Sequence, residues 1–180
     1  MKRIISLFVF LLSILASSAQ KIVYDKINKE SGFRMIATSQ ELCPLPEENF
    51  WAMFYLVWGG NGNIGDYHLT FRYFSTTPCS IEQGNRLLLF LNDGTKLSLS
   101  SDYYDNSEKS EDPFEADISF PYEIVCSFTI TKLQIGYIIN TGLKGLSLEL
   151  TPKSVSVRGN FIDFSEKLST LLQLIDDKNK

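Results

Sequence analysis

The sequence contains few of the residues that most often hold metals or carry catalysis. It has one histidine and three cysteines in 180 residues, and no Cys-x-x-Cys pair. A zinc site takes nitrogen or sulfur ligands at characteristic spacings, and this sequence matches none of them. The Gly-x-Ser-x-Gly and His-Glu-x-x-His motifs and the phosphate-binding Gly-x-x-x-x-Gly-Lys-Ser/Thr loop are also missing. The sequence therefore predicts no metal, no cofactor and no catalytic centre marked by a motif.

An excess of basic residues is missing too. The 17 Lys and Arg residues are outnumbered by 21 Asp and Glu residues. Because nucleic-acid-binding domains carry a basic patch or stripe, nucleic acid is not expected as a partner. Seven acidic residues and one lysine lie in the segment 101–117, which we call the acidic stretch.

Only the N-terminus has a long apolar run, at residues 4–15. Two basic residues precede it and the small residues 16–19 follow, which is the layout of a secretory signal peptide. About a dozen apolar residues are too few to cross a hydrocarbon layer roughly 30 Å thick, so a membrane anchor is not favoured. We expect cleavage between Ala19 and Gln20, a secreted or periplasmic location, and no transmembrane segment in the remaining domain, 20–180.

The three cysteines would enter a compartment where disulfides persist. Cys43 precedes Pro44 and Cys79 follows Pro78, so both are expected in exposed, turn-like segments. Cys126 lies in a strand pattern and is expected to be a buried free thiol. An odd count leaves one thiol over, so the sequence allows either a bridge between Cys43 and Cys79 or no bridge at all.

Most of the chain after the leader alternates with the period of a β-strand. The composition, 44% hydrophobic with 11 Gly and 6 Pro, is that of an ordinary globular domain. Asp93 and Gly94 lie between two alternating runs and predict a hairpin with a type I′ turn. Residues 50–58 are apolar on both faces, which predicts a central strand covered on both sides, and the glycine-rich segment 59–65 predicts a turn after it. Further strands are expected at 22–27, 33–37, 66–74, 87–91, 95–99 and 118–130, with a last pair at 146–150 and 155–157 on either side of Pro152.

Two segments have helical signals. Thr131 and Gln134 have the spacing of a capping box for a short helix ending near Gly142, although the β-branched residues of this segment and Gly136 oppose a helix. The tail predicts a longer helix, capped by Asp163 with Glu166, whose apolar stripe comprises Phe164, Leu168, Leu171, Leu172 and Ile175. Such a stripe usually packs on a sheet. The predicted fold is therefore α+β: a mostly antiparallel β-sheet, a sandwich or curved sheet, with a C-terminal α-helix packed on it.

The end of the chain resembles that of many small proteins exported by Gram-negative anaerobes of the gut. The resemblance rests on the Ala19-Gln20 cleavage site and on the segments 132–133, 142–146 and 164–168. It implies export, and it implies no particular activity.

One predicted strand places Asp66, His68 and Arg72 on the same face. A carboxylate beside an imidazole could orient a general base or form part of a metal site. The alternative is an ordinary polar strand face in contact with water. The sequence places no second histidine and no nucleophile near them, which favours the alternative.

The acidic stretch has two interpretations. Asp102, Asp105 and Glu108 could converge around calcium, although their spacing does not match the usual calcium-binding loop. A solvated loop is the simpler interpretation.

Aromatic residues suggest a binding surface. Tyr103 and Tyr104 lie in the acidic stretch and Trp58 precedes the glycine-rich segment, and exposed rings could stack on sugars or accept peptide side chains. Alternatively, Trp51 and Trp58 belong to the core.

These patterns favour an exported, non-enzymatic binding or envelope-associated domain whose ligand is a protein or a carbohydrate. The alternative is a secreted hydrolase that uses carboxylates scattered along the chain. An enzyme should have a concave pocket with at least two ionisable groups of shifted pKa, and a binding domain a shallow patch or an exposed sheet edge.

Overall fold

The computed structural model describes residues 20–43, 51–62, 64–109, 121–159 and 161–180. The predicted signal peptide, the beginning of the strand predicted at 118–130, and residues 110–117 of the acidic stretch lie outside the described residues.

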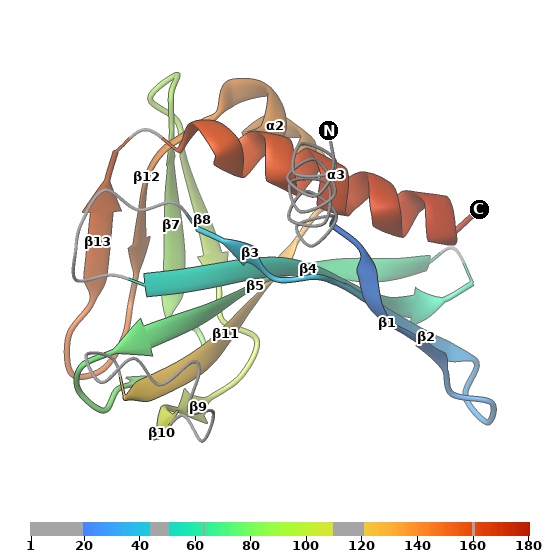
Figure 1. Ribbon diagram of the computed structural model, residues 1–180, viewed down its shortest axis with the longest axis horizontal. Helices are drawn as coiled ribbons and strands as arrows, with labels where there is room; N and C mark the ends of the chain where they lie inside the picture. The colour runs from blue at the N-terminus through green and yellow to red at the C-terminus, as the bar shows by residue number, and fades with distance from the viewer. Residues whose placement is uncertain (1–19, 44–50, 63, 110–120, 160) are drawn as a thin grey trace, which may run out of the picture.

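Two antiparallel sheets make up most of the molecule (Figure 1). The larger has seven strands in the order β1-β2-β4-β5-β11-β10, and β3 also pairs with β4. Its strands are β1 (Ile22–Ile27), β2 (Phe33–Thr38), β3 (Glu41–Leu42), β4 (Trp51–Asn61), β5 (Ile64–Ser75), β10 (Glu108–Lys109) and β11 (Tyr122–Ile130). The smaller has the order β13-β12-β7-β8, with β7 (Arg86–Leu91), β8 (Lys96–Ser100), β12 (Leu143–Leu148) and β13 (Val155–Arg158). A short third ladder joins β6 (Ser80–Ile81) to β9 (Asp105–Asn106).

The hairpin between β7 and β8 forms where the sequence predicts it, but its turn is of another type. A type I′ turn needs positive φ at both central residues. Gly94 has a φ of +91°, and no non-glycine residue described in the structure has a positive φ. The Gly94 amide donates to the carbonyl of Leu91. The loop is therefore a three-residue turn that ends in a left-handed glycine.

Both predicted helices form. α2 (Lys132–Thr141) begins with the predicted capping box, since the Thr131 hydroxyl accepts from the Gln134 amide and the Gln134 side chain accepts from the Thr131 amide. α3 (Ile162–Lys178) confirms the helical tail, but its predicted cap is wrong. Its N-cap residue is Phe161, which makes no side-chain capping bond and is buried. Burial of this ring in the core fixes the start of the helix instead.

The core lies between one face of the seven-stranded sheet, α3 and the four-stranded sheet. Figure 1 shows α3 running along the larger sheet while the smaller sheet crosses it steeply. The rings of Phe54 on β4 and Phe164 on α3 lie 4.4 Å apart, and Phe71 on β5 stacks on Phe164 at 6.5 Å. The predicted packing of the tail helix on an antiparallel sheet is therefore observed.

No described helix or sheet packs on the opposite face of the seven-stranded sheet, which we call the open face. β4 is a central strand, as predicted, but its two faces differ. Ala52, Phe54 and Leu56 are fully buried, whereas Tyr55 and Val57, which point to the open face, are only half-buried. Within the described residues, the predicted cover on both faces of β4 is therefore found on one face only. An apolar side chain tolerates burial but does not itself supply a covering layer.

The glycine-rich segment 59–65 is mostly strand, because β4 continues to Asn61 and β5 begins at Ile64. A Cβ atom on Gly65 would lie 2.6 Å from Cζ2 of Trp58, so the indole of Trp58 lies directly on the glycine backbone. This close approach, and not a turn, explains the glycine at position 65.

All three cysteines are free thiols, so the structure contains no bridge between Cys43 and Cys79. Cys43 is buried, contrary to prediction, because its amide bonds to the carbonyl of Ala52 and carries the β3–β4 pairing into the core. Cys126 is buried, as predicted. Burial raises the pKa of Cys43 to about 12 and also raises the pKa of Cys126.

Candidate functional site on the open face

Cross-strand pairing fixes which side chains share the open face, because directly opposed residues point to the same side of a sheet. One row runs from Tyr24 through Ala37, Val57 and His68 to Thr129. The face therefore extends across five strands, from the edge strand β1 to β11.

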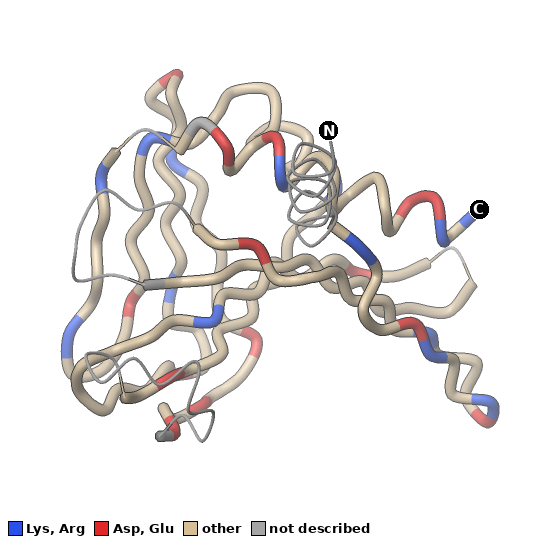
Figure 2. Tube along the Cα trace, in the orientation of Figure 1, with Lys and Arg blue, Asp and Glu red and all other residues tan. Residues whose placement is uncertain are grey.

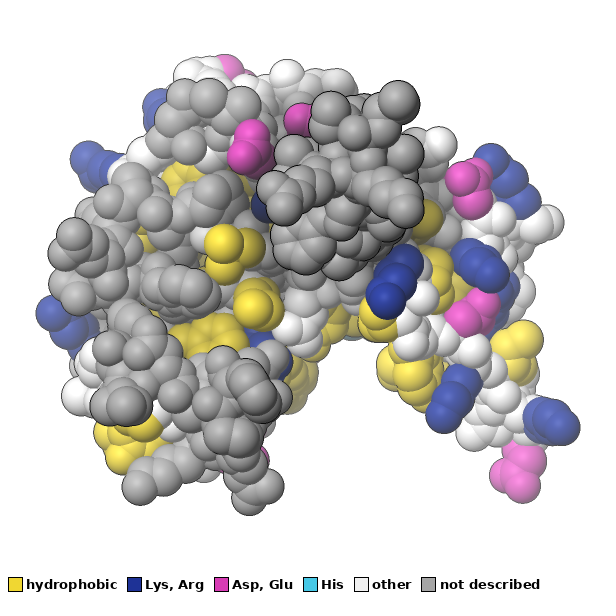
Figure 3. All heavy atoms as spheres, viewed as in Figure 1, with side chains coloured by type: hydrophobic (Ala, Val, Ile, Leu, Met, Phe, Trp, Pro, Cys, Tyr) yellow, Lys and Arg dark blue, Asp and Glu magenta, His cyan; other side chains and the backbone are white. Residues whose placement is uncertain are grey.

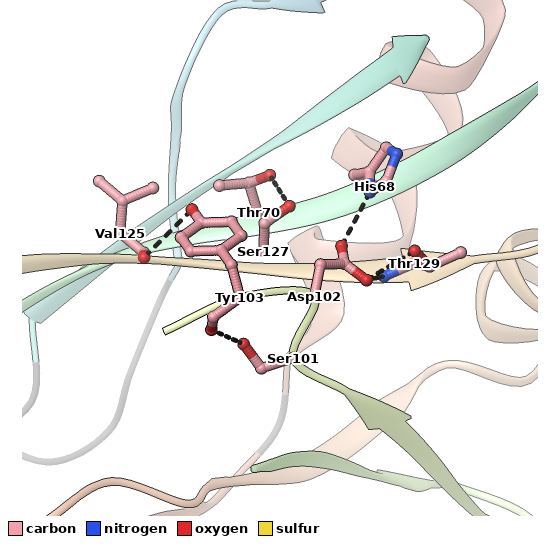
Figure 4. A network of polar contacts seen from close by, with 8 residues as sticks. All are labelled: His68, Thr70, Ser101, Asp102, Tyr103, Val125, Ser127 and Thr129. Carbon is pink, nitrogen blue, oxygen red and sulfur yellow. Dashed lines mark hydrogen bonds and ion pairs between the residues drawn. The ribbon is translucent and has the colours of Figure 1, made fainter. Parts of the chain in front are cut away.

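A polar network occupies the β5 and β11 end of this row (Figure 4). The Nδ1 atom of His68 lies 2.9 Å from Oδ2 of Asp102. The other oxygen of Asp102 accepts from the hydroxyl of Thr129 at 2.7 Å and from its amide at 3.2 Å. Two donors on β11 thus orient the carboxylate, and the carboxylate orients the imidazole.

Two further polar pairs continue along the same strands. The hydroxyls of Thr70 and Ser127 lie 3.2 Å apart, and Arg72 donates to Oε2 of Glu123 from Nη2 at 2.6 Å and from Nε at 3.1 Å. The Arg72 guanidinium also lies 5.3 Å from the ring centroid of Phe74. The charges at this end of the face are therefore paired within the chain.

The segment that follows β8 runs along the edge of β11 and adds an aromatic ring. Tyr103 donates from its hydroxyl to the carbonyl of Val125 at 3.4 Å, and 40% of its surface is exposed. Burial and the nearby carboxylate of Asp105 raise the pKa of Tyr103 to about 12, so its phenol is neutral. Tyr104 is 53% exposed and bonds to the side chain of Asn106.

The other end of the open face lies on the β1–β2 hairpin, which projects from the body as an arm (Figure 1). Tyr24, Phe33 and Met35 are 39%, 41% and 41% exposed. Met35 pairs with Gly59, and the Phe33 ring lies close over this glycine, which places both residues on the open face. Figure 3 shows hydrophobic side chains along the hollow between arm and body.

Part of this site was predicted from the sequence. Asp66, His68 and Arg72 share one face, as predicted, but His68 bonds to Asp102 and not to Asp66. Asp102 comes from the acidic stretch, 34 residues away, and no local pattern indicates that contact.

The remaining predictions concern the two tryptophans and a calcium site. Trp58 lies on the core face of the sheet and is 3% exposed, as its alternative interpretation predicts, so it cannot act beside His68. The Trp51 side chain lies outside what the structure describes. Within the described part of the chain, no three His, Cys, Asp or Glu side chains group as metal ligands, so Asp102, Asp105 and Glu108 do not converge there.

None of the described pockets includes His68 among its lining residues. One of these pockets, of about 500 Å³, is lined by Tyr73, Cys79, Lys153 and neighbouring hydroxyl and apolar residues. Burial raises the pKa of both Tyr73 and Cys79, so both are neutral near pH 7. A nucleophilic thiol needs a lowered pKa, which makes this pocket a poor site for covalent catalysis.

Comparison with protein-family models, curated proteins and solved structures found no match for this chain. Among the described helices, none combines the length and the apolar character that crossing a membrane requires.

Proposed function

We propose that the protein is an exported, non-enzymatic binding domain, secreted or periplasmic, that holds a protein partner on its open face. The observation that carries the proposal is the exposure of Tyr24, Phe33 and Met35 on a sheet face that no described layer covers. Aromatic residues, methionine and arginine are the residues enriched in protein interfaces. The leader at 1–19 supports export.

The charge pattern favours a protein over a highly charged ligand. The arm, residues 20–38, carries charges of both signs (Figure 2): Asp25 and Glu30 beside Lys21, Lys26, Lys29 and Arg34. Its field is therefore mixed and only weakly basic. His68 with Asp102 and Arg72 with Glu123 already satisfy one another. Such pairs supply specificity at the rim of an interface, while the aromatic end supplies the contact area.

The alternative, a carboxylate-dependent hydrolase, has one supporting feature, the oriented pair of Asp102 and His68. A general base also needs a substrate pocket and a group to act on. Neither described pocket of more than 300 Å³ includes His68 among its lining residues. The geometry therefore favours binding.

Site-specific photo-cross-linking in the exporting cell tests the proposal. A photoreactive phenylalanine analogue at position 33 should give a discrete cross-linked protein. The same analogue at Leu133, which is 87% exposed on α2, is the matched control and should not give that product. With the purified partner, Phe33→Ala should weaken binding about tenfold or more and Leu133→Ala should not. Equal products from both positions, or none at position 33, would contradict the proposal.

A further inference from the structure

A second pocket lies on the other side of the seven-stranded sheet, where the end of α3 meets the start of α2 and β5. It has a volume of about 380 Å³, near the lower end of the range for small-molecule sites. Its lining residues come from four elements and the helix end: Trp58, Gly65, Tyr67, Lys132, Asp176, Asn179 and Lys180.

Asp176 is the centre of its polar wall. One carboxylate oxygen accepts from the hydroxyl of Tyr67 at 2.9 Å, and the other lies 2.6 Å from Nζ of Lys132. Burial and the neighbouring carboxylate raise the pKa of Tyr67, so its hydroxyl keeps the proton that it donates. Each carboxylate oxygen has a further lone pair, and the pocket therefore retains acceptor capacity next to an ammonium donor.

Asn179 adds an acceptor that the chain does not use. Its Oδ1 atom is buried, and no described group of the protein donates to it. Buried polar atoms almost always have a partner, because an unpaired one loses its bond to water without replacement. Asn179 lies at the end of α3 and lines the pocket, so a rotation of its side chain would present this acceptor to a ligand there.

The remaining wall is apolar. The indole of Trp58 lies on the backbone of Gly65, and both residues line the pocket. Lys132 and Asp176 neutralise each other, and Lys180 is paired with Asp177, so the pocket has no large net charge.

We infer that this pocket binds a small, neutral, polyhydroxylated ligand of about the size of one sugar ring. A hydroxyl both donates and accepts, which matches the amide oxygen of Asn179, the free lone pairs of Asp176 and the ammonium of Lys132. An apolar ring edge packs on Trp58. The near balance of charge favours a neutral ligand over an anion or a cation. The site is separate from the open face and does not depend on the proposed protein partner.

Tryptophan fluorescence of the mature domain tests the inference. Trp51→Phe leaves Trp58 as the only tryptophan. This variant is titrated with glucose, galactose, N-acetylglucosamine and glycerol, and with glucosamine and galacturonate as charged comparators. At least one neutral sugar should change the Trp58 emission saturably, and the charged comparators should bind more weakly.

A pair of amide substitutions on the same helix supplies the control. Asn179→Leu removes the unpaired acceptor, so it should raise the dissociation constant about tenfold without lowering the melting temperature. Gln173→Leu makes the same change at an exposed position outside the pocket and should leave binding unchanged. Absence of a saturable response to every neutral sugar, stronger binding of a charged comparator, or unaltered binding by Asn179→Leu would overturn the inference. Phe33→Ala, which tests the open face, should not alter it.

Discussion

Replacing Phe164 by alanine tests how α3 is joined to the seven-stranded sheet. Phe164 is fully buried, and its ring contacts Phe54 and Phe71, which come from two central strands. Truncating a buried phenylalanine to alanine costs about 3–5 kcal/mol, because the ring loses its transfer free energy and leaves a cavity. In a domain of this size, each kcal/mol lowers the melting temperature by roughly 2–4 °C. We therefore expect Phe164→Ala to lower it by roughly 6–20 °C.

Thermal and urea unfolding of residues 20–180, followed by circular dichroism, measure this loss. Phe33→Ala is the matched control, because it removes the same ring from the exposed arm. Its cost should stay below about 1 kcal/mol. If Phe164→Ala were no more destabilising than Phe33→Ala, the account of the core would be refuted.

Three further predictions concern the glycines, the buried acids and the leader. Gly65→Ala should destabilise the domain by about 1–3 kcal/mol and shift the emission of Trp58, since the new Cβ atom would overlap the indole. Gly136 lies in α2 with open space around it, so Gly136→Ala should stabilise the domain by about 0.5–1 kcal/mol. The free energy of unfolding, measured in urea from pH 8 to 10.5, should fall as the pH rises above about 8.5. The raised pKa values of Cys43, Cys126 and Tyr67 keep these groups protonated in the folded state, while the same groups ionise in the unfolded chain. A constant free energy of unfolding across this range would contradict those pKa shifts. Mass spectrometry of the exported protein should give a chain beginning at Gln20, and a chain beginning at Met1 would exclude cleavage there.

Local sequence patterns predicted most of the helices and longer strands, because these elements form mainly through interactions between residues close in the sequence. Alternation placed the longer strands of both sheets, but not the two-residue strands β3 and β10. The Thr131–Gln134 capping box placed α2, since a capping box depends on residues a few positions apart. The start of α3 was missed for the opposite reason. Asp163 and Glu166 satisfy the local rule for a cap, but burial of Phe161 against other elements determines where the helix begins.

The candidate site was only partly accessible from sequence. Strand periodicity was enough to place Asp66, His68 and Arg72 on one face. Periodicity does not show which residue from a distant segment will cross the sheet edge, so the bond between His68 and Asp102 could not be anticipated. Strand periodicity also does not show which of the two apolar faces of β4 packs against the other elements and which stays open.

Hydroxyl-radical footprinting of the free mature domain measures whether one face of the seven-stranded sheet is open. Tyr24, Phe33 and Met35 should be oxidised rapidly, because about two fifths of each surface is exposed. Phe54 and Phe164, which are fully buried, should be oxidised only on unfolding. Protection of Phe33 and Met35 to the same degree as these core residues would show instead that the face is covered.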